Sequence, residues 1–358
     1  MKIMKTIIEK IDKNQKNTDI IREAGRILKE GGLVAFPTET VYGLGADALN
    51  EDAAKKIYAA KGRPSDNPLI IHITNMKALD KIVSEVPEKA VKVAEKYWPG
   101  PLTMILPKAD IVPKETTGGL DSVAVRFPSD RIAQELILAA GGYVAAPSAN
   151  TSGRPSPTTA GHVAEDLGDA IDMIIDGGMV GMGLESTIID VTVNPPMILR
   201  PGFITYEMVK EIVPDATEDR TIFTKPTKEF KPKAPGMKYR HYAPSADYTI
   251  YKGDEVKVAE KIIELANEKA DEGKITGIIT ADQHLHMYQG RLNKSIKVVS
   301  LGDLEKPETV ANHLFKALRD FDKVDTEFIF GEAFSEKNVG QAIMNRLTKA
   351  AGYNIIDV

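Results

Sequence analysis

KGRPSDNPLIIHI, residues 61–73, carries the chain from the end of a helix into a buried strand through one tight turn. The preceding EDAAKKIYAAK, residues 51–61, begins with acidic residues, as a helix N-terminus favours. Gly62 and Pro64 suit a fixed turn, and the apolar run that follows suits a strand. Lys61 and Arg63 flank the glycine, so the turn is either a polyphosphate site or a solvated charged loop.

The alternation of strands and helices continues on both sides of this stretch. Residues 1–17 read as a polar lead-in, and PTETVYGLGADAL, residues 37–49, reads as a loop. The alternation predicts one α/β domain over residues 1–213. Its expected strands are 33–36, 68–73, 102–106, 121–127, 143–146, 171–176, 185–191 and 197–200.

The composition changes between residues 214 and 246, where prolines and charges replace the periodic pattern. We interpret this stretch as a linker, and its aromatic and basic end, PGMKYRHYAP, is unusual for an inert tether. Residues 247–358 then follow a β-α-β-β-α-β-α order, which predicts a smaller Rossmann-like α/β domain with a mainly parallel sheet. His284 and His286 are expected on its surface.

The composition, the net charge and the absence of certain motifs exclude several classes of protein. The 358 residues include no cysteine, which rules out thiolate chemistry and cysteine-ligated metals. A net charge of -5 argues against a protein that mainly coats nucleic acid. No P-loop, dinucleotide fingerprint or nucleophile elbow occurs. Without a signal peptide or an apolar run of membrane-spanning length, a cytoplasmic protein without membrane contact is expected.

Polar side chains collect where the expected strands end. PSAN, residues 147–150, follows a strand, and the alternation of Ser148 and Asn150 can point both side chains into one cleft, although the same residues also favour simple turns. Arg126 and Arg200 also end strands. Together with Lys61 and Arg63 they form a set of four cations that suggests an anion pocket.

Taken together, these segments resemble the L-threonylcarbamoyladenylate synthase family with its YrdC-type domain. The motifs are the K-x-R of 61–63, the S-x-N of 148–150, PTETVYGLG at 37–45, NPL-x-x-H at 67–72 and the G-x-ESTI-x-D loop. They cover most of residues 20–212, and the linker and the tail G-x-AIMNRL-x-KAA match the long two-domain form. The resemblance implies a twisted open mixed sheet with a large cavity.

The resemblance also implies a nucleotidyltransferase reaction. L-Threonine, bicarbonate and ATP would give threonylcarbamoyl-AMP and pyrophosphate, for the tRNA modification N6-threonylcarbamoyladenosine. Lys61 and Arg63 would act on the ATP phosphates and count as catalytic. The other ATP contacts implied are Asn67, Ser122, Ser148, Asn150, Ser156, Arg200 and Tyr239. The threonine contacts implied are Thr40, His72, Arg126, the backbone at Ala146, and Ser186, with Arg126 on the carboxylate.

Magnesium would be held mainly by the nucleotide and water, with no dedicated protein ligands. The resemblance implies the tRNA threonylcarbamoyl-transfer machinery as a partner, and the 214–246 linker is expected to close over the site as a lid. Two other readings stay open: a factor that binds double-stranded RNA or assists ribosome maturation without this catalysis, and a transferase that handles carbamoyl phosphate. Weak RNA binding fits any of these.

Overall fold

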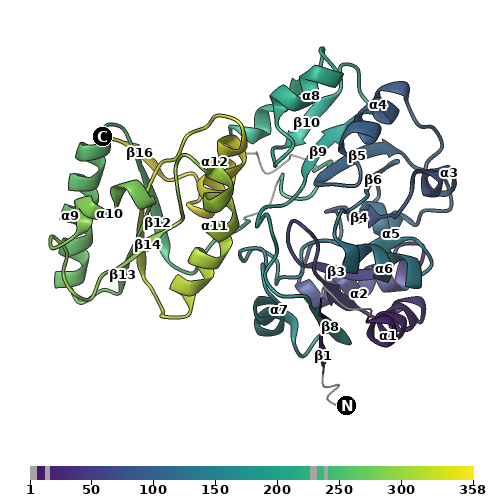
Figure 1. Cartoon of the computed structure of the whole chain (residues 1–358), viewed down its shortest axis with the longest axis horizontal. Helices are drawn as coiled ribbons and strands as arrows, with labels where there is room; N and C mark the ends of the chain where they lie inside the picture. Colours follow the sequence, from purple (N-terminus) through teal and green to yellow (C-terminus); the bar gives the residue numbers. More distant parts are fainter. Residues whose placement is uncertain (1–5, 13–16, 226–231, 238–240) are drawn as a thin grey trace. The chain divides into compact units, whose positions relative to one another are not determined.

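The computed structural model describes residues 6–12, 17–225, 232–237 and 241–358. The chain forms two compact units (Figure 1). The first comprises residues 1–152, 156–181 and 185–239, and the second comprises residues 153–155, 182–184 and 240–358. Each unit has its own sheet.

The first unit alternates short strands with helices on both sides of a sheet. Its strands are β1 (Ile7–Lys10), β2 (Val34–Phe36), β3 (Gly43–Asp47), β4 (Ile70–His72), β5 (Leu102–Pro107), β6 (Ser122–Arg126), β7 (Val144–Ala145), β8 (Met173–Asp176), β9 (Thr187–Asp190), β10 (Met197–Arg200) and β11 (Thr217–Glu218). Its helices are α1 (Thr18–Lys29), α2 (Glu51–Lys61), η1 (Met76–Ala78), α3 (Leu79–Ile82), α4 (Glu88–Tyr97), α5 (Lys114–Thr117), α6 (Arg131–Ala139), α7 (Ala160–Leu167), α8 (Tyr206–Ile212) and η2 (Arg220–Ile222).

These strands form one mixed sheet in the order β1-β8-β2-β3-β7-β4-β6-β5-β9-β10-β11. Parallel pairs such as β4 with β6 alternate with antiparallel pairs such as β5 with β6. This arrangement confirms the predicted mixed α/β class. The β4–β6–β5 centre matters most for function, because it aligns His72, Arg126 and Thr103 side by side across three neighbouring strands.

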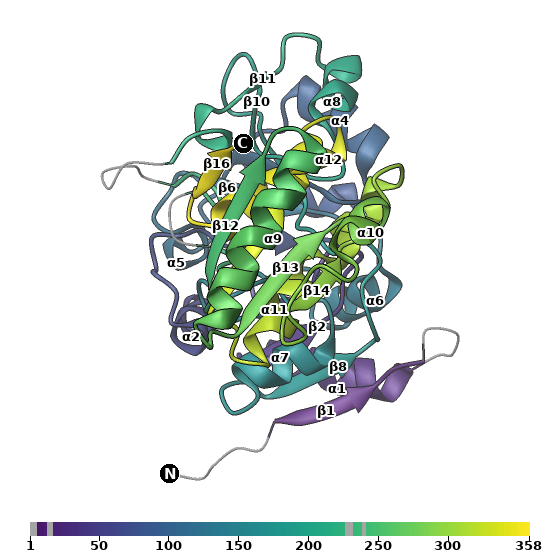
Figure 2. The same cartoon turned by 90° about the vertical axis from the view of Figure 1, so that its left-hand side faces the viewer.

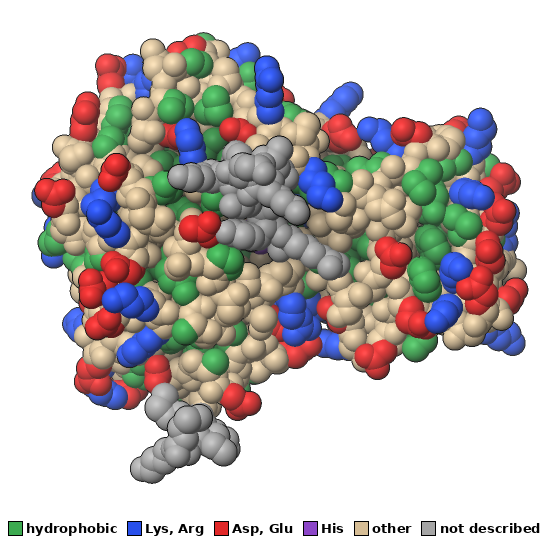
Figure 3. All heavy atoms as spheres, turned by 180° about the vertical axis from the view of Figure 1, so that it is seen from behind, with side chains coloured by type: hydrophobic (Ala, Val, Ile, Leu, Met, Phe, Trp, Pro, Cys, Tyr) green, Lys and Arg blue, Asp and Glu red, His purple; other side chains and the backbone are tan. Residues whose placement is uncertain are grey.

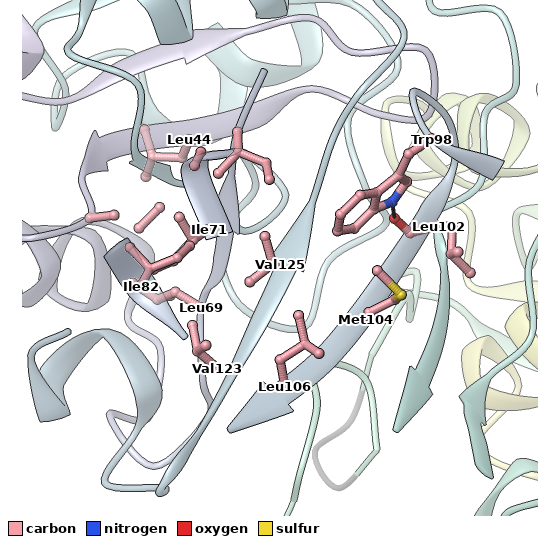
Figure 4. Close-up of a cluster of buried hydrophobic side chains, with 14 of the residues drawn as sticks. Leu44, Leu69, Ile71, Ile82, Trp98, Leu102, Met104, Leu106, Val123 and Val125 are labelled. Atoms are coloured by element: carbon pink, nitrogen blue, oxygen red, sulfur yellow. Dashed lines mark hydrogen bonds between the residues drawn. The ribbon is translucent and has the colours of Figure 1, made fainter. Parts of the chain in front are cut away.

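The central strands have an apolar face that forms the main core. Ile71, Met104 and Val125 point into this core, which helices α2, α3 and α4 cover (Figure 4). Trp98, at the end of α4, packs there as well, and its indole Nε1 donates to Leu102 O at 2.7 Å. Since side chains alternate along a strand, the residues between these apolar ones lie on the opposite face of the sheet.

Two expectations about the N-terminal third were wrong. Residues 43–47 form strand β3 within the expected loop, and residues 7–10 form β1 within the expected lead-in. The glycines hid β3, because glycine is unfavourable in strands unless neighbours approach closely. They do so here: a Cβ on Gly45 would lie 2.9 Å from the Phe36 ring and 3.0 Å from Val144.

The stretch read as a linker begins inside the first unit. Strand β11 and helix η2 fall within residues 214–246, and Ala216 and Ile222 are buried in the main core. Residues 232–237 also belong to the first unit. A cut after residue 212 would therefore strip core side chains as well as any lid.

The second unit is a parallel sheet between helices, as predicted, but it has five strands where the sequence indicated four, because β16 was not expected. Helix α9 lies over one face of this sheet, and α11 and α12 lie over the other (Figure 2). The strand order is β14-β13-β15-β12-β16. The elements are β12 (Asp247–Lys252), α9 (Glu255–Asp271), β13 (Thr276–Thr280), η3 (Asp282–His284), α10 (Leu285–Tyr288), β14 (Lys297–Ser300), α11 (Pro307–Asp322), β15 (Phe328–Glu332), α12 (Val339–Ala350) and β16 (Ile355–Asp357).

A buried carboxylate sits at the carboxyl ends of the central strands of this sheet. Glu332 accepts hydrogen bonds from Thr280 Oγ1 at 2.8 Å and from Tyr288 Oη at 2.5 Å. His284 Nδ1 lies 2.7 Å from the other carboxylate oxygen, and the histidine side chain is only 12% exposed. The expectation that His284 lies on the surface was therefore wrong, because this carboxylate draws the imidazole inward.

The exterior carries charged side chains of both signs, intermixed on the face shown in Figure 3. Many form short-range pairs along a helix, such as Arg26 with Glu23 and Glu30 on α1. Pairs of this exposed kind contribute little to stability. Among the described residues, none of the helices combines the length and the apolar composition that a bilayer crossing requires.

Candidate active site

Two of the residues singled out from the sequence, His72 and Arg126, lie on the face of the central strands opposite the main core. His72 and Arg126 are direct neighbours in the pairing of β4 with β6, and both are nearly fully buried. Thr103 on β5 is the next residue across. Polar side chains in the middle of a buried sheet face cost free energy unless they have hydrogen-bonding or ionic partners. The partners of these three side chains therefore show which groups make up the site.

Lys61 is fixed against the PSAN segment. Its side chain is 1% exposed, and Nζ donates to Ser148 O at 2.5 Å and to Asn150 O. Helix α2 ends at this lysine because Gly62 adopts the left-handed conformation, with φ 58°. The segment 147–150 is itself anchored beside residues 42–44, through Leu44 N to Pro147 O and Ala149 N to Tyr42 O.

Arg63 and Asn67 lie in the turn that follows Lys61. We call residues 61–67 the 61–67 corner. Arg63 Nε and Nη2 donate to Asn67 O at 3.3 and 3.2 Å, and Nη2 also reaches Pro68 O at 3.1 Å. The Asn67 side chain is 1% exposed, yet its Oδ1 has no hydrogen-bond partner among the described residues. An unsatisfied buried amide oxygen beside a fixed guanidinium indicates a place where a ligand supplies the missing donor.

The predicted serines occupy two kinds of environment. Ser148 Oγ donates to Asn150 Oδ1 at 2.6 Å, and the buried Ser156 donates to Glu185 Oε1 at 2.5 Å. Ser122 starts β6 on the same side of that strand as Arg126 and is half-buried. The structure therefore ties Ser148 and Asn150 together as the sequence alternation predicted.

Arg200 and Ser186 form a buried unit at the β9–β10 side of the sheet. Arg200 Nε donates to Ser186 O at 3.0 Å, and Nη2 donates to Ser186 Oγ at 3.2 Å. Ser186 Oγ also lies 2.8 Å from Thr103 Oγ1. This chain of contacts links the end of β10 to the row on β5 and β6.

Part of the aromatic-basic linker packs on this same face. Ala234 and Met237 form an apolar cluster with Ile70, Ile105, Ala124, Ile188 and Leu199, all from the strand face that carries the polar row. Arg200 Nη1 donates to Pro235 O at 3.3 Å, and Lys233 Nζ lies 3.5 Å from the buried Asp190 carboxylate. Tyr239, the linker residue expected to contact ATP, lies outside the described residues.

The loop that holds Glu39 and Thr40 reaches Arg126 in the middle strand of the row. Thr40 is fully buried, with its Oγ1 2.8 Å from Thr38 Oγ1. Arg126 Nη2 lies 2.7 Å from Glu39 Oε1, with the two side chains 5% and 11% exposed. Ala146 follows β7 and donates its N–H to Ile70 O at 2.9 Å, which places its backbone at the edge of β4.

His72 is a neutral imidazole. Burial, reinforced by the nearby Arg126 charge, lowers the pKa of His72 to about 3, and hydrogen bonding to the Ile70 and Val144 backbone opposes this only partly. Its Nδ1 lies 3.1 Å from Ile70 O, which assigns the proton to that nitrogen because a carbonyl oxygen can only accept. A neutral side chain here avoids a third charge next to Arg126 and Glu39.

This lowered pKa predicts a loss of stability in mild acid. The unfolded chain binds a proton on His72 below about pH 6.5, whereas the folded chain does not until about pH 3. Stability therefore falls through this window by roughly 1.4 kcal/mol per pH unit. Between pH 7 and pH 5, the free energy of unfolding of His72→Asn should fall by about 2 kcal/mol less than that of the unsubstituted protein.

Trp98 provides the readout, because it is the single tryptophan of the chain and is buried in the first unit. Urea titrations followed by its fluorescence at both pH values measure the difference. The exposed His286, substituted in the same way, is the control. An equal pH-dependent loss in the His72 variant and the unsubstituted protein would contradict a neutral buried imidazole.

Two family models together match nearly the whole chain. The model Sua5_yciO_yrdC, described as "Telomere recombination", matches residues 26–202, and "Threonylcarbamoyl-AMP synthase, C-terminal domain" matches residues 204–352. Threonylcarbamoyl-AMP synthase of Pyrococcus abyssi is 48% identical over 338 residues, which make up 94% of this chain and 96% of that protein. The Bacillus subtilis synthase is 44% identical, with 99% and 100% covered.

The chain belongs to the threonylcarbamoyl-AMP synthase family. The solved structure described as P. abyssi Sua5 complexed with L-threonine supports the same conclusion in three dimensions. It matches with a TM-score of 0.91 at 47% identity, over 99% of each chain. Both units therefore support membership of this family, which agrees with the two-domain form that the motifs indicated.

Three residues of this synthase-family site were not singled out from the sequence. Glu39 lies between two threonines and looked like part of a loop, Thr103 is the one polar residue in LTMIL, and Glu185 adjoins Ser186. For Thr103 a signal existed, because a polar residue in a buried strand is unusual. For Glu39 none existed, because its partner Arg126 is distant in sequence.

The fit of magnesium can be judged from the donors present. Among the described residues, no group of three His, Asp or Glu side chains is placed to hold a metal ion. The unsatisfied Asn67 Oδ1 can accept from a metal-bound water. The magnesium requirement stays a proposal.

Proposed function

We propose that this protein synthesises threonylcarbamoyl-AMP from L-threonine, bicarbonate and ATP, with release of pyrophosphate. The observation that carries this proposal is the match to threonylcarbamoyl-AMP synthases over both units. The geometry supports it, because Arg126 lies in the buried polar row, Arg200 reaches this row through Ser186 and Thr103, and Lys61 and Arg63 lie at the turn that leads into β4. Such a site can bring two anions together against their mutual repulsion.

The β4–β6–β5 row is proposed as the threonine end. Arg126 offers a buried guanidinium that suits a carboxylate, and neutral His72 can bond to a hydroxyl without repelling the arginine. Thr40, the backbone at Ala146 and Ser186 surround these two groups. The Arg200 contact to Ser186 fixes the orientation of the serine.

The 61–67 corner and the PSAN segment, residues 147–150, are proposed to bind the nucleotide. Lys61 and Arg63 supply charge beside the phosphates, and Asn67, Ser122, Ser148, Asn150, Ser156 and Arg200 supply polar contacts. The threonine carbamate oxygen attacks the α-phosphorus, and the bond to the pyrophosphate oxygen breaks. Such a nucleotidyl transfer depends on positioning and charge rather than on a protein nucleophile. Magnesium bound to the phosphates would neutralise part of their charge.

One incubation tests the proposal. Purified protein receives ATP, labelled bicarbonate and each of several amino acids in turn, and adenylated carbamate and pyrophosphate are measured. Product that requires both threonine and bicarbonate is expected. An RNA-binding factor would form none, and a carbamoyl-phosphate transferase would need carbamoyl phosphate in place of bicarbonate. The tRNA threonylcarbamoyl-transfer machinery is a proposed partner. When this machinery and tRNA are added, the transfer of the product to tRNA is measured.

The 232–237 segment supports a lid in the same proposal. Met237 is 2% exposed and packs on the face that carries the polar row, so its docking keeps water from that face. Met237→Ser should weaken docking by about 2–3 kcal/mol. We expect about tenfold slower synthesis and more ATP consumed per threonylcarbamoyl-AMP formed.

The control for this experiment is Met179→Ser. Met179 also lies in the first unit and is 39% exposed, so the same change removes little burial there. The ratio of AMP to threonylcarbamoyl-AMP at equal protein concentration is the measurement. If Met237→Ser and Met179→Ser give the same ratio and rate, the segment does not act as a lid.

A further inference from the structure

Glu39 is a buried carboxylate for which the proposed reaction has so far assigned no role. It lies in the loop between β2 and β3, next to the predicted threonine contact Thr40, and its side chain is 11% exposed. Its Oε1 lies 2.7 Å from Arg126 Nη2. Glu39 therefore faces the guanidinium expected to bind the threonine carboxylate.

The Glu39 and Arg126 side chains are in contact, but this contact does not satisfy their hydrogen-bonding groups. Despite the 2.7 Å approach, the two groups are not aligned as donor and acceptor. Both carboxylate oxygens of Glu39, and Nε and Nη2 of Arg126, have no hydrogen-bond partner among the described residues. Buried charges normally fill these positions, because each unsatisfied group retains the cost of leaving water.

A ligand with one negative and one positive group would satisfy both partners at once. An α-amino acid is such a ligand, since its carboxylate matches Arg126 and its ammonium matches Glu39. In the empty site Glu39 neutralises Arg126. When the substrate carboxylate binds to the Arg126 guanidinium, the Glu39 oxygens can accept hydrogen bonds from the ammonium group.

We infer that Glu39 receives the α-ammonium group of threonine and accepts its proton before carbamate formation. This inference rests on the proposed function, because the amine must be neutral to attack carbon. It adds a catalytic role to a residue that the sequence pattern did not indicate. It also explains why a carboxylate, rather than a neutral side chain, lies beside Arg126.

The proton steps balance as follows. One N–H proton passes from the ammonium group to the Glu39 carboxylate, which becomes a carboxylic acid and leaves a neutral amine. Protonated Glu39 returns this proton to the hydroxyl of bicarbonate, whose C–OH bond breaks to give water and carbon dioxide. The nitrogen lone pair then forms the N–C bond, and a second N–H proton leaves to solvent as the carbamate forms.

A binding experiment tests the contact. L-Threonine and 2,3-dihydroxybutanoate, in which a hydroxyl replaces the ammonium group, are titrated into the full-length protein and into Glu39→Gln. The unsubstituted protein should prefer threonine by about tenfold or more, and Glu39→Gln should reduce this preference to below about threefold. An unchanged preference would overturn the inference. Glu135→Gln, a surface glutamate 40% exposed, is the matched control.

A comparison of two reactions tests the proton transfer. Synthesis from threonine needs the amine deprotonated, whereas formation of ATP from added threonylcarbamoyl-AMP and pyrophosphate breaks only the bond to phosphorus. Glu39→Gln should lower synthesis by about 100-fold or more and leave ATP formation within about threefold. Equal losses in both reactions would show a merely structural role, and an unchanged synthesis rate would also overturn the inference.

The pH dependence provides a readout that a structural role would not change. The synthesis defect of Glu39→Gln should shrink as pH rises from 7 to 9, because solution then supplies the neutral amine. Glu39→Asp retains the carboxylate, so it should recover part of the activity at pH 7. A defect that stays constant over this pH range would contradict the inference. Failure of the proposed function itself is separate, since the unsubstituted protein would then form no threonylcarbamoyl-AMP.

Discussion

Arg126→Met is expected to reduce kcat/KM for threonine by about 1,000-fold. A charge-assisted hydrogen bond to the substrate carboxylate contributes roughly 1.5–3 kcal/mol, and the uncompensated charge of Glu39 would in addition repel that carboxylate. Methionine retains the length and the apolar stem of the side chain, so the cavity left behind is small. Initial rates of threonylcarbamoyl-AMP formation over a range of threonine concentrations measure the effect.

The double variant Arg126→Met/Glu39→Gln separates stability from activity. Removal of the unpaired carboxylate should recover much of the lost unfolding free energy, because the two residues are in contact and their effects are not additive. Activity should stay low in the double variant. Arg131→Met, at an exposed arginine paired with Glu135, is the matched control. Near-normal activity in either Arg126 variant would contradict a carboxylate-binding role.

Lys61→Met should produce the second large effect, with turnover lowered by about 100- to 1,000-fold. The variant removes a cation from the proposed phosphate end and also leaves Ser148 O and Asn150 O without the ammonium donor. Buried carbonyl groups without donors cost about 1–3 kcal/mol each, so the PSAN segment should loosen and the protein should lose stability. Single-turnover rates with saturating ATP and threonine, together with urea titrations, measure both consequences.

Lys55→Met gives the matched control on the same helix. Lys55 is 52% exposed and pairs with Glu51 and Asp52 one turn away, so its loss should change stability by less than about 0.5 kcal/mol. Lys61→Arg should not restore activity, because a planar guanidinium does not fit the buried position of an ammonium. Full activity in Lys61→Met would remove this residue from the site.

The sequence allowed the mixed α/β class and the parallel second sheet to be predicted. These features depend on local patterns, namely periodicity, turn residues and short motifs. Strand β3 was missed because its glycines look unfavourable until Phe36 and Val144 are seen beside them. The pairing of Glu39 with Arg126 depends on strand order, which local patterns do not encode.

The second unit places a buried polar network at one end of its sheet. Its sheet is as regular as predicted, and the Glu332 network lies at the carboxyl ends of the central strands, where ligands collect in open parallel sheets. The residues around Glu332 include Tyr288 and His284, which contact its two carboxylate oxygens, and the other ring nitrogen of His284 lies 3.5 Å from Glu255. This network accounts for the burial of Glu332 without a ligand.

The alternation along β4, β5 and β6 has a consequence for how new specificities could arise in this fold. Every second residue faces the helices and the main core, while the residues between them form the opposite face, which carries the polar row and a smaller apolar cluster. Substitutions at positions 72, 103 and 126 would leave Ile71, Met104 and Val125 in place, but each would also have to satisfy the partner of the side chain it replaces. An ancestral scaffold of this kind could therefore exchange one acid substrate for another through paired changes, such as one at position 126 together with one at position 39.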